Sequence, residues 1–263
     1  MANKPKVAVY KFSSCDGCQL SLLNLEDELL DLAGAVEIAY FLEARRQVLP
    51  GPYDLGIVEG SVTTPEEEER IQSIRRDCKF LITIGTCATA GGVQALRNFA
   101  QVAEYANLVY PHPEYFETLE TSTPMSEHVQ VDLELWGCPV NKYQLLEVIT
   151  AVLHQRRPNL PQHSVCLDCK RRGVTCVTVA KGVPCLGPIT QSGCGAICPA
   201  YGRGCYGCFG PQPDADIESF VPLLQESQRY PGEAVNLLRT ISGYAPAFQK
   251  AAQLILDGED DHD

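Results

Sequence analysis

Eight of the 13 cysteines in this 263-residue chain lie within 43 residues, between Cys166 and Cys208. The surrounding segment, residues 165–213, is rich in glycine and proline and shows almost no hydrophobic periodicity. A segment with this pattern cannot bury an apolar core of its own, so another interaction must order it. Metal binding can do so, because the free energy of binding becomes folding free energy when the unfolded chain has no preformed site. The sequence therefore predicts that these cysteines are metal ligands.

The spacing of the eight cysteines predicts two sites with four ligands each. The first run follows the pattern Cys-x2-Cys-x6-Cys-x8-Cys, and the second follows Cys-x3-Cys-x6-Cys-x2-Cys. The ferredoxin run Cys-x2-Cys-x2-Cys-x3-Cys is absent, so the spacing does not support an ordinary ferredoxin insert. Spacing alone leaves both structural zinc and iron–sulfur clusters open. The first run consists of Cys166, Cys169, Cys176 and Cys185, and the second of Cys194, Cys198, Cys205 and Cys208.

The first part of the chain alternates strand-like apolar runs with helix-like segments. This alternation is typical of a mostly parallel, three-layer α/β sheet. Residues 156–161, Arg-Arg-Pro-Asn-Leu-Pro, have the composition of a linker, so we expect domains at 1–157 and 162–263. We expect strands at 7–12, 36–42, 54–62, 80–84 and 129–136, helices at 18–32, 65–78, 142–155, 215–228 and 231–257, and a frayed acidic end at 258–263.

Four further cysteines follow three of the expected strands. Cys15 and Cys18 follow the first strand, Cys87 the fourth and Cys138 the fifth. Ligands bind beyond the carboxyl ends of strands in parallel sheets, so we expect these four thiols at one edge. A thioredoxin-like redox pair at the first two positions would leave the other two thiols unexplained. One close pair with two distant single ligands favours a 4Fe–4S cluster over a zinc ribbon.

Cys78 stands apart from these groups, at the start of a buried strand, and is expected to be a small buried hydrophobe. The other 12 cysteines form three groups of four, which is the arrangement that a row of electron-conducting clusters requires. The net charge of −12 argues against binding to nucleic acid. No apolar run is long enough for a membrane-spanning helix or a secretory signal, so we expect a reducing, cytoplasmic location.

Taken together, the motifs resemble the small, electron-transferring subunits of nickel–iron hydrogenases. They look most like the delta subunits of soluble, cytoplasmic sulfhydrogenases of the NAD(P)-linked group 3b. The resemblance covers residues 7–210 and departs from membrane-bound relatives at Cys166, where these have His, and at Cys198, where they often have Pro. It rests on CDGCQ at 15–19, VEGS at 58–61, GTCA at 85–88, GCP at 137–139, VCLDC at 165–169, PCLGP at 184–188 and GCYGC at 204–208.

The resemblance implies a flavodoxin-like α/β domain, followed by a small, irregular iron–sulfur domain with C-terminal helices. It also implies that Asp16 and Glu59 flank the first cluster, where a structural hydrogen-bonding role is expected. Three 4Fe–4S clusters would be carried: a proximal one on Cys15, Cys18, Cys87 and Cys138, a medial one on Cys194, Cys198, Cys205 and Cys208, and a distal one on Cys166, Cys169, Cys176 and Cys185.

The same resemblance implies the partners. No Asp-Pro-Cys-x-x-Cys motif occurs, so the Ni–Fe site is expected on a large subunit and no catalytic residue in this chain. A flavin/NAD(P)-binding subunit and an iron–sulfur subunit would complete a heterotetramer that couples H2 oxidation or evolution to NAD(P). Deazaflavin-reducing and heterodisulfide-reductase-linked hydrogenases are the near alternatives. A zinc-stabilised interaction protein without redox activity is the alternative of another class.

Overall fold

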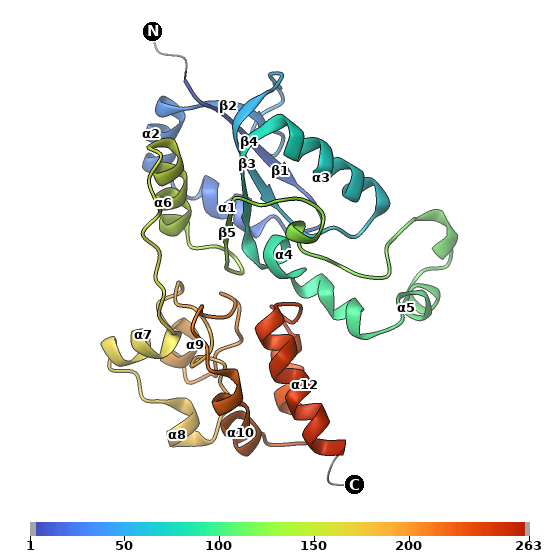
Figure 1. The fold of residues 1–263 in the computed structure, drawn as a ribbon, viewed down its shortest axis with the longest axis vertical. Helices are drawn as coiled ribbons and strands as arrows, with labels where there is room; N and C mark the ends of the chain where they lie inside the picture. Colours follow the sequence, from blue (N-terminus) through green and yellow to red (C-terminus); the bar gives the residue numbers. More distant parts are fainter. Residues whose placement is uncertain (1–3, 261–263) are drawn as a thin grey trace. The chain divides into compact units, whose positions relative to one another are not determined.

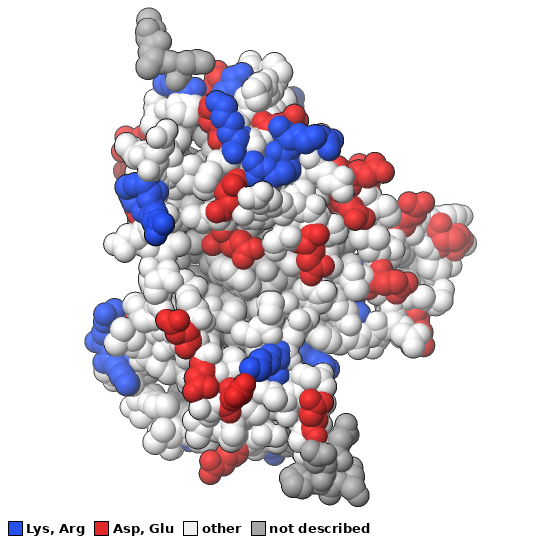
Figure 2. Space-filling model, in the orientation of Figure 1, with Lys and Arg blue, Asp and Glu red and all other residues white. Residues whose placement is uncertain are grey.

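The computed structural model describes residues 4–260, which divide into two compact units between Pro158 and Asn159. We call them unit 1 and unit 2 (Figure 1). Side chains of both charges are visible on both units (Figure 2). No helix in the described part of the chain is both long and apolar enough to cross a membrane.

Unit 1 is built on a five-stranded, fully parallel sheet with the strand order β2-β1-β3-β4-β5. This is the flavodoxin-like order, in which the chain reverses direction across the sheet beside β1. The predicted α/β fold class is therefore confirmed. The strands are β1 (Lys6–Lys11), β2 (Glu37–Phe41), β3 (Tyr53–Glu59), β4 (Cys78–Ile84) and β5 (Leu133–Leu135).

The last strand is shorter than the sequence predicts. Residues 129–136 have a strand-like pattern, but only Leu133–Leu135 forms β5. The Asp132 carboxylate accepts a hydrogen bond from the backbone N–H of Leu81 at 2.7 Å and pairs with Arg75 at 2.6 Å. A side chain thus takes the donor on β4 that a longer β5 would use, and the ladder between β4 and β5 begins at the pair Ile82 and Leu133.

Helices cover both faces of the sheet (Figure 1). On one side lie α1 (Gly17–Leu23), α2 (Asp27–Ala35) and α6 (Lys142–Leu153), and on the other lies α3 (Pro65–Asp77). The helix expected at 18–32 is two helices, because Glu26 has a φ of 56° that a continuous α-helix excludes. The start of α3 matches its sequence signal, since the Thr64 side chain accepts a hydrogen bond from Glu67 N at 3.2 Å.

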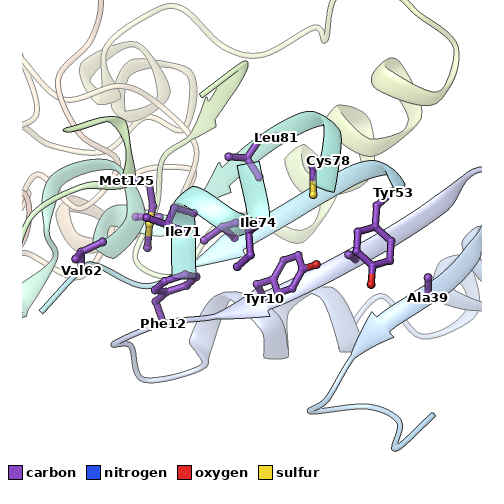
Figure 3. Packing of buried hydrophobic residues seen from close by; sticks show 13 residues of the cluster. Tyr10, Phe12, Ala39, Tyr53, Val62, Ile71, Ile74, Cys78, Leu81 and Met125 are labelled. Atoms are coloured by element: carbon purple, nitrogen blue, oxygen red, sulfur yellow. The ribbon is translucent and has the colours of Figure 1, made fainter. Parts of the chain in front are cut away.

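Side chains of the sheet and α3 form a core that contains Cys78 (Figure 3). Ile71 and Ile74 of α3 pack against Leu81 and the tyrosines of β1 and β3. Cys78 is only 4% exposed, and a Cβ on Gly56 would come within 2.5 Å of its Sγ. This thiol is therefore a packing element at the amino end of β4, where it fills the space that the glycine leaves.

After β4 the chain forms α4 (Gly85–Ala90), η1 (Val93–Phe99), α5 (Val102–Val109) and two short 3-10 turns, η2 (Pro113–Tyr115) and η3 (Met125–Glu127), before β5. Helix α5 has an apolar composition but, like α2, no buried residue. This segment connects β4 to β5, and it contains Cys87 in α4, whereas Cys138 follows β5.

Unit 2 contains a cysteine-rich segment, which three further helices follow. The segment holds the helices α7 (Val165–Arg171), α8 (Val177–Lys181) and α9 (Ile197–Ala200). The helices after it are α10 (Ile217–Ser227), α11 (Glu233–Arg239) and α12 (Pro246–Asp260), so the helix expected at 231–257 is again two. In the turn between them the buried Ser242 hydroxyl donates to Gly207 O at 2.8 Å and ties the turn to the cysteine-rich segment.

The acidic end differs from expectation where the structure describes it. Residues 258–260 continue α12 instead of fraying, and 261–263 lie outside the described residues. The apolar face of α12 explains this, because Phe248 and Ile255 are fully buried and hold the helix against its neighbours.

Candidate metal centres

Two glycines make room for the thiols at the strand ends of unit 1. Cys15 follows β1, Cys18 lies in α1, and Cys87 lies in α4 directly after β4. A Cβ at Gly85 would come within 2.4 Å of Cys18 Sγ, and one at Gly92 within 2.5 Å of Cys87 Sγ. Both glycines also have positive φ, which side chains disfavour. The local backbone is therefore shaped around these sulfur atoms.

The four thiols at the strand ends lie close enough to interact with one another. Cys138, which follows β5, interacts electrostatically with Cys15. Cys87 interacts with both of them, and Cys18 interacts with Cys87 and Cys138. The parallel topology explains this grouping, because β1, β4 and β5 end at the same edge of the sheet. The four sulfur atoms can therefore act on one bound group.

Burial favours the neutral thiol at Cys18, Cys87 and Cys138 in the metal-free chain. It raises the pKa of Cys87 to about 11 and is also the main cause of the raised pKa of Cys18 and Cys138. The nearby Glu59 carboxylate adds to each effect, since a negative charge disfavours a second one. The thiols will hold their protons until the positive charge of a metal favours the thiolate.

Glu59 fixes the turn that carries Cys18. Its carboxylate is 1% exposed and accepts hydrogen bonds from the backbone N–H groups of Cys18, at 3.0 Å, and Gln19, at 3.2 Å. Burial raises the pKa of this carboxyl, and the two N–H donors oppose that shift. Asp16, by contrast, pairs with Lys11 at 2.8 Å on the surface side of the turn. Glu59 thus has the structural hydrogen-bonding position, at the start of α1.

Gln94 is a supporting residue that the motifs did not reveal. Its Nε2 donates to Ser13 O at 2.6 Å, and its Oε1 accepts from Cys87 Sγ at 3.5 Å. One side chain therefore links the loop before Cys15 to the helix that carries Cys87. Its only signal in the sequence is its position after Gly91-Gly92, which is too common to identify it.

In unit 2 a cavity of about 510 Å³ is bounded by residues of α7, α8 and α10. A Cβ at Gly187 would lie 3.3 Å from Cys185 Sγ and 3.6 Å from Cys166 Sγ, so these sulfur atoms flank the same point. Cys166 interacts electrostatically with the other three thiols of its run, and burial raises its pKa to about 11. All four cysteines of the first run line this cavity: Cys166, Cys169, Cys176 and Cys185.

The cysteines of the second run lie around α9 and the turn that follows it. Cys198 interacts electrostatically with Cys194, and Cys205 with Cys208. Burial is the main cause of the raised pKa of Cys198 and of the fully enclosed Cys205. Among residues 4–260, no three His, Cys, Asp or Glu side chains converge tightly enough to hold a single metal ion.

Comparison with known proteins identifies the family. Residues 15–152 match the family model "NADH ubiquinone oxidoreductase, 20 Kd subunit". The chain is 36% identical to sulfhydrogenase 2 subunit delta of Pyrococcus furiosus, over 84% of this chain and 92% of that protein. The chain belongs to the family of nickel–iron hydrogenase small subunits. This small subunit is also 33% identical to a subunit of the F420-non-reducing hydrogenase vhu of Methanocaldococcus jannaschii, over 78% of this chain and 81% of that one.

Solved structures agree with the small-subunit fold. A chain of an NAD+-reducing [NiFe]-hydrogenase in the H2-reduced state superposes with a TM-score of 0.56 and 27% identity, covering 60% of this chain and 96% of that one. The actinobacterial-type NiFe-hydrogenase of Ralstonia eutropha H16 has a TM-score of 0.56 over 98% of this chain and 91% of that one. At 17% identity this second likeness concerns the fold alone. The predicted resemblance is confirmed, and the chain is an electron-transfer subunit of a hydrogenase complex.

Proposed function

We propose that this small subunit relays electrons through three 4Fe–4S clusters, between the Ni–Fe site of the large subunit and a flavin/NAD(P)-reducing subunit. The observation that carries the proposal is the placement of the cysteines. The four strand-end thiols of unit 1 interact with one another, four thiols line one cavity of unit 2, and the last four occur before, within and after α9. The remaining cysteine, Cys78, lies in the hydrophobic core.

The residues fit iron–sulfur clusters. Each group offers four sulfur donors, which is the ligand set of a 4Fe–4S cluster. In unit 1 the space around the thiols exists because Gly85 and Gly92 carry no side chain. A relative from Archaeoglobus profundus, 28% identical over 79% of this chain, is named an iron-sulfur subunit. We assign the proximal cluster to the group at the sheet edge, the distal cluster to the cavity and the medial cluster to the α9 group.

Bound 4Fe–4S clusters supply one-electron carriers, and the protein's own residues hold and insulate them. Residues of α7, α8 and α10 line the cavity of the first run. Burial excludes water from Cys18 and Cys205, which are 6% and 4% exposed. The carboxylate of Glu59 holds the start of α1 and so fixes the direction of Cys18.

The resemblance of the motifs to NAD(P)-linked sulfhydrogenases supports NAD(P) as the acceptor, and the chain is 36% identical to a sulfhydrogenase delta subunit. The F420-non-reducing hydrogenase subunits, at 33% identity or less, support a second candidate, a small subunit that delivers electrons to another type of acceptor. The match to an NAD-reducing hydrogenase delta subunit of Cupriavidus necator, 30% identical over 60% of this chain, favours the first. We also propose a cytoplasmic heterotetramer with an additional iron–sulfur subunit.

An exposed apolar surface on η1 and α5 supports assembly with the large subunit. Leu108 is 83% exposed and Tyr105 is 60% exposed, although both are apolar or aromatic side chains. Monomeric proteins rarely leave such patches open. On η1, Leu96 is 47% exposed and lies two residues after Gln94, which accepts a hydrogen bond from the Cys87 thiol of the proximal group.

The test is elemental and spectroscopic analysis of the complex purified without oxygen. Three cubane clusters correspond to about 12 iron atoms and a similar amount of acid-labile sulfide per chain. The brown absorbance should bleach when dithionite is added. Iron near four per chain together with stoichiometric zinc would reject the three-cluster assignment and favour the zinc-stabilised alternative for unit 2.

A further inference from the structure

The acidic chain contains a basic segment, and it coincides with the cysteine-rich part of unit 2. Residues 165–213 contain five Lys or Arg and a single carboxylate, Asp168, so their net charge is +4. The rest of the chain therefore carries −16, since the total is −12. The five cations are Lys170, Arg171, Arg172, Lys181 and Arg203.

Four of these five residues lie at the C-terminal ends of α7 and α8, two of the helices that bound the cavity of the first run. Lys170 lines the cavity, and Arg171 ends α7. Lys181 ends α8, and its Nζ is 3.2 Å from the position of a Cβ on Gly202, so it lies beside Arg203. All five are exposed. In Figure 2, Lys and Arg side chains cover the outer end of α7.

The positive charges are available to a partner. Within residues 4–260, none of the five forms an ion pair with a carboxylate of this chain. The single local carboxylate, Asp168, is instead engaged by His163 at 3.3 Å and by the Ser192 hydroxyl. The segment thus presents cations that no carboxylate of the segment neutralises.

Exposed apolar side chains line the same cavity. Val179 is 88% exposed and Leu223 is 60% exposed, and both line the cavity. An apolar centre with a charged rim is the usual anatomy of a protein–protein interface. Glu226, on the α10 wall, is the acidic residue on the opposite side of the cavity. The cations therefore mark the α7–α8 side as the one that meets a negative surface.

We propose that the α7–α8 face docks an acidic protein surface that surrounds the redox centre of the electron-accepting partner. This inference rests on the proposed function, because it takes the cavity as the site where electrons leave the chain. Complementary charge would guide the two redox centres together and fix their orientation. The contact would then bring the acceptor next to the four cysteines of the cavity.

A different role for these cations would be to offset the negative charge of the clusters alone. Lys170 and Arg203 have part of that role, since they lower the pKa of Cys166 and Cys198. The two roles respond differently to salt. Exposed charges that meet across an interface are screened within about 8–10 Å at physiological ionic strength, so docking weakens as salt rises.

The experiment uses the whole complex and the double variant Arg171→Glu/Lys181→Glu. Arg76→Glu/Arg157→Glu is the matched control, since it changes the charge equally at exposed positions of unit 1. Native mass spectrometry across a salt series measures which subunits stay bound. We expect the test variant to release the electron-accepting subunits with a dissociation constant raised about tenfold, while the Ni-containing subunit stays bound.

Iron content and hydrogen–deuterium exchange separate this inference from the proposed function. The test variant should have the same iron content and the same exchange rate as the unaltered complex. If the unaltered complex itself lacked iron or exchange, the proposed function would be rejected instead of this inference. If the double reversal lowers the iron content, Arg171→Gln/Lys181→Gln repeats the test without reversed charge and should give a smaller shift of the same sign. Equal salt profiles for test and control variants, or loss of the Ni-containing subunit first, would overturn the proposal.

Discussion

The backbone N–H of Cys205 donates a hydrogen bond to Sγ of Cys185, at 3.1 Å. These two cysteines are 20 residues apart and belong to different runs, so the two groups of ligands in unit 2 touch at this point. The bond also opposes the burial that raises the pKa of Cys185. Through this contact a distal ligand and a medial ligand of the proposed relay are joined by one peptide group and one hydrogen bond.

Replacement of single ligands should distinguish the two ends of the relay. In Cys169→Ser the weaker oxygen ligand should damage only the distal cluster, so hydrogen–deuterium exchange at the Ni–Fe site should persist while H2-driven NADP reduction falls sharply. In Cys15→Ser electron delivery to every acceptor should fall. If Cys169→Ser lost the exchange and Cys15→Ser kept NADP reduction, the proximal and distal clusters would have been assigned in the wrong order.

Removal of iron should expose the cysteine-rich segment to protease. One of its hydrophobic clusters contains only Val165, Ala196 and Cys205, with two further cysteines packed against it, so we expect the bound metal to supply much of its order. Trypsin should therefore cut apoprotein at Lys170 and Arg171 much faster than the loaded chain. Cleavage after Arg76 in α3, which contributes to the core of unit 1, is the internal control and should not accelerate. Equal rates at the α7 sites would contradict a structural role for the metal.

Cys78→Ser should leave the iron content and the activity unchanged. Because the thiol is buried among apolar side chains, the hydroxyl should lower the free energy of unfolding by about 1–2 kcal/mol. Denaturant unfolding and iron analysis of the same preparation check both statements. Loss of a full cluster's iron would mean that this cysteine is a ligand and that one of the assigned ligands is not.

Leu108→Glu should weaken association with the large subunit, because it places a charge in the exposed apolar surface of α5. Leu30→Glu is the control, since Leu30 of α2 is similarly exposed, at 72% against 83%. Both changes should alter the stability of the chain by less than about 0.5 kcal/mol. Co-purification with a tagged large subunit is the measurement, and equal recovery of the two variants would remove α5 from the interface.

Glu233→Gln should destabilise unit 2 in a pH-dependent way. Hydrogen bonds from Arg229 to the buried Glu233 carboxylate, at 2.6 Å from the backbone N and 2.9 Å from Nε, lower its pKa. Because the pKa of Glu233 is lower in the folded chain than its ordinary value of 4.5, the ionised carboxylate stabilises the fold above pH 4.5. This stabilisation is lost as the pH falls through the pKa of the folded chain. The variant should melt about 2–4 °C lower at pH 7, with a difference that shrinks below pH 4.5. A difference independent of pH would exclude this ion pair as the cause.

Local sequence signals were enough for the architecture of unit 1. Alternating strands and helices predicted the parallel sheet, and Thr64-Pro65 predicted the start of α3. Local signals could not predict the effects of residues that act through contacts with distant parts of the sequence. The Asp132 side chain shortens β5 by binding a donor on β4 51 residues away, and Glu26 breaks a helix whose periodicity is continuous.

Sequence alone predicted three groups of four cysteines and gave the resemblance to hydrogenase small subunits, because ligand spacing and strand ends are local patterns. Tertiary structure decided which thiols share a space. The cavity of the first run, the Cys205–Cys185 hydrogen bond and the glycine spaces beside Cys18 and Cys87 arise from segments that meet only in the folded chain. The physical reason is that the burial of a thiol and its distance to other thiols depend on neighbours far away in the sequence, which local patterns do not reveal.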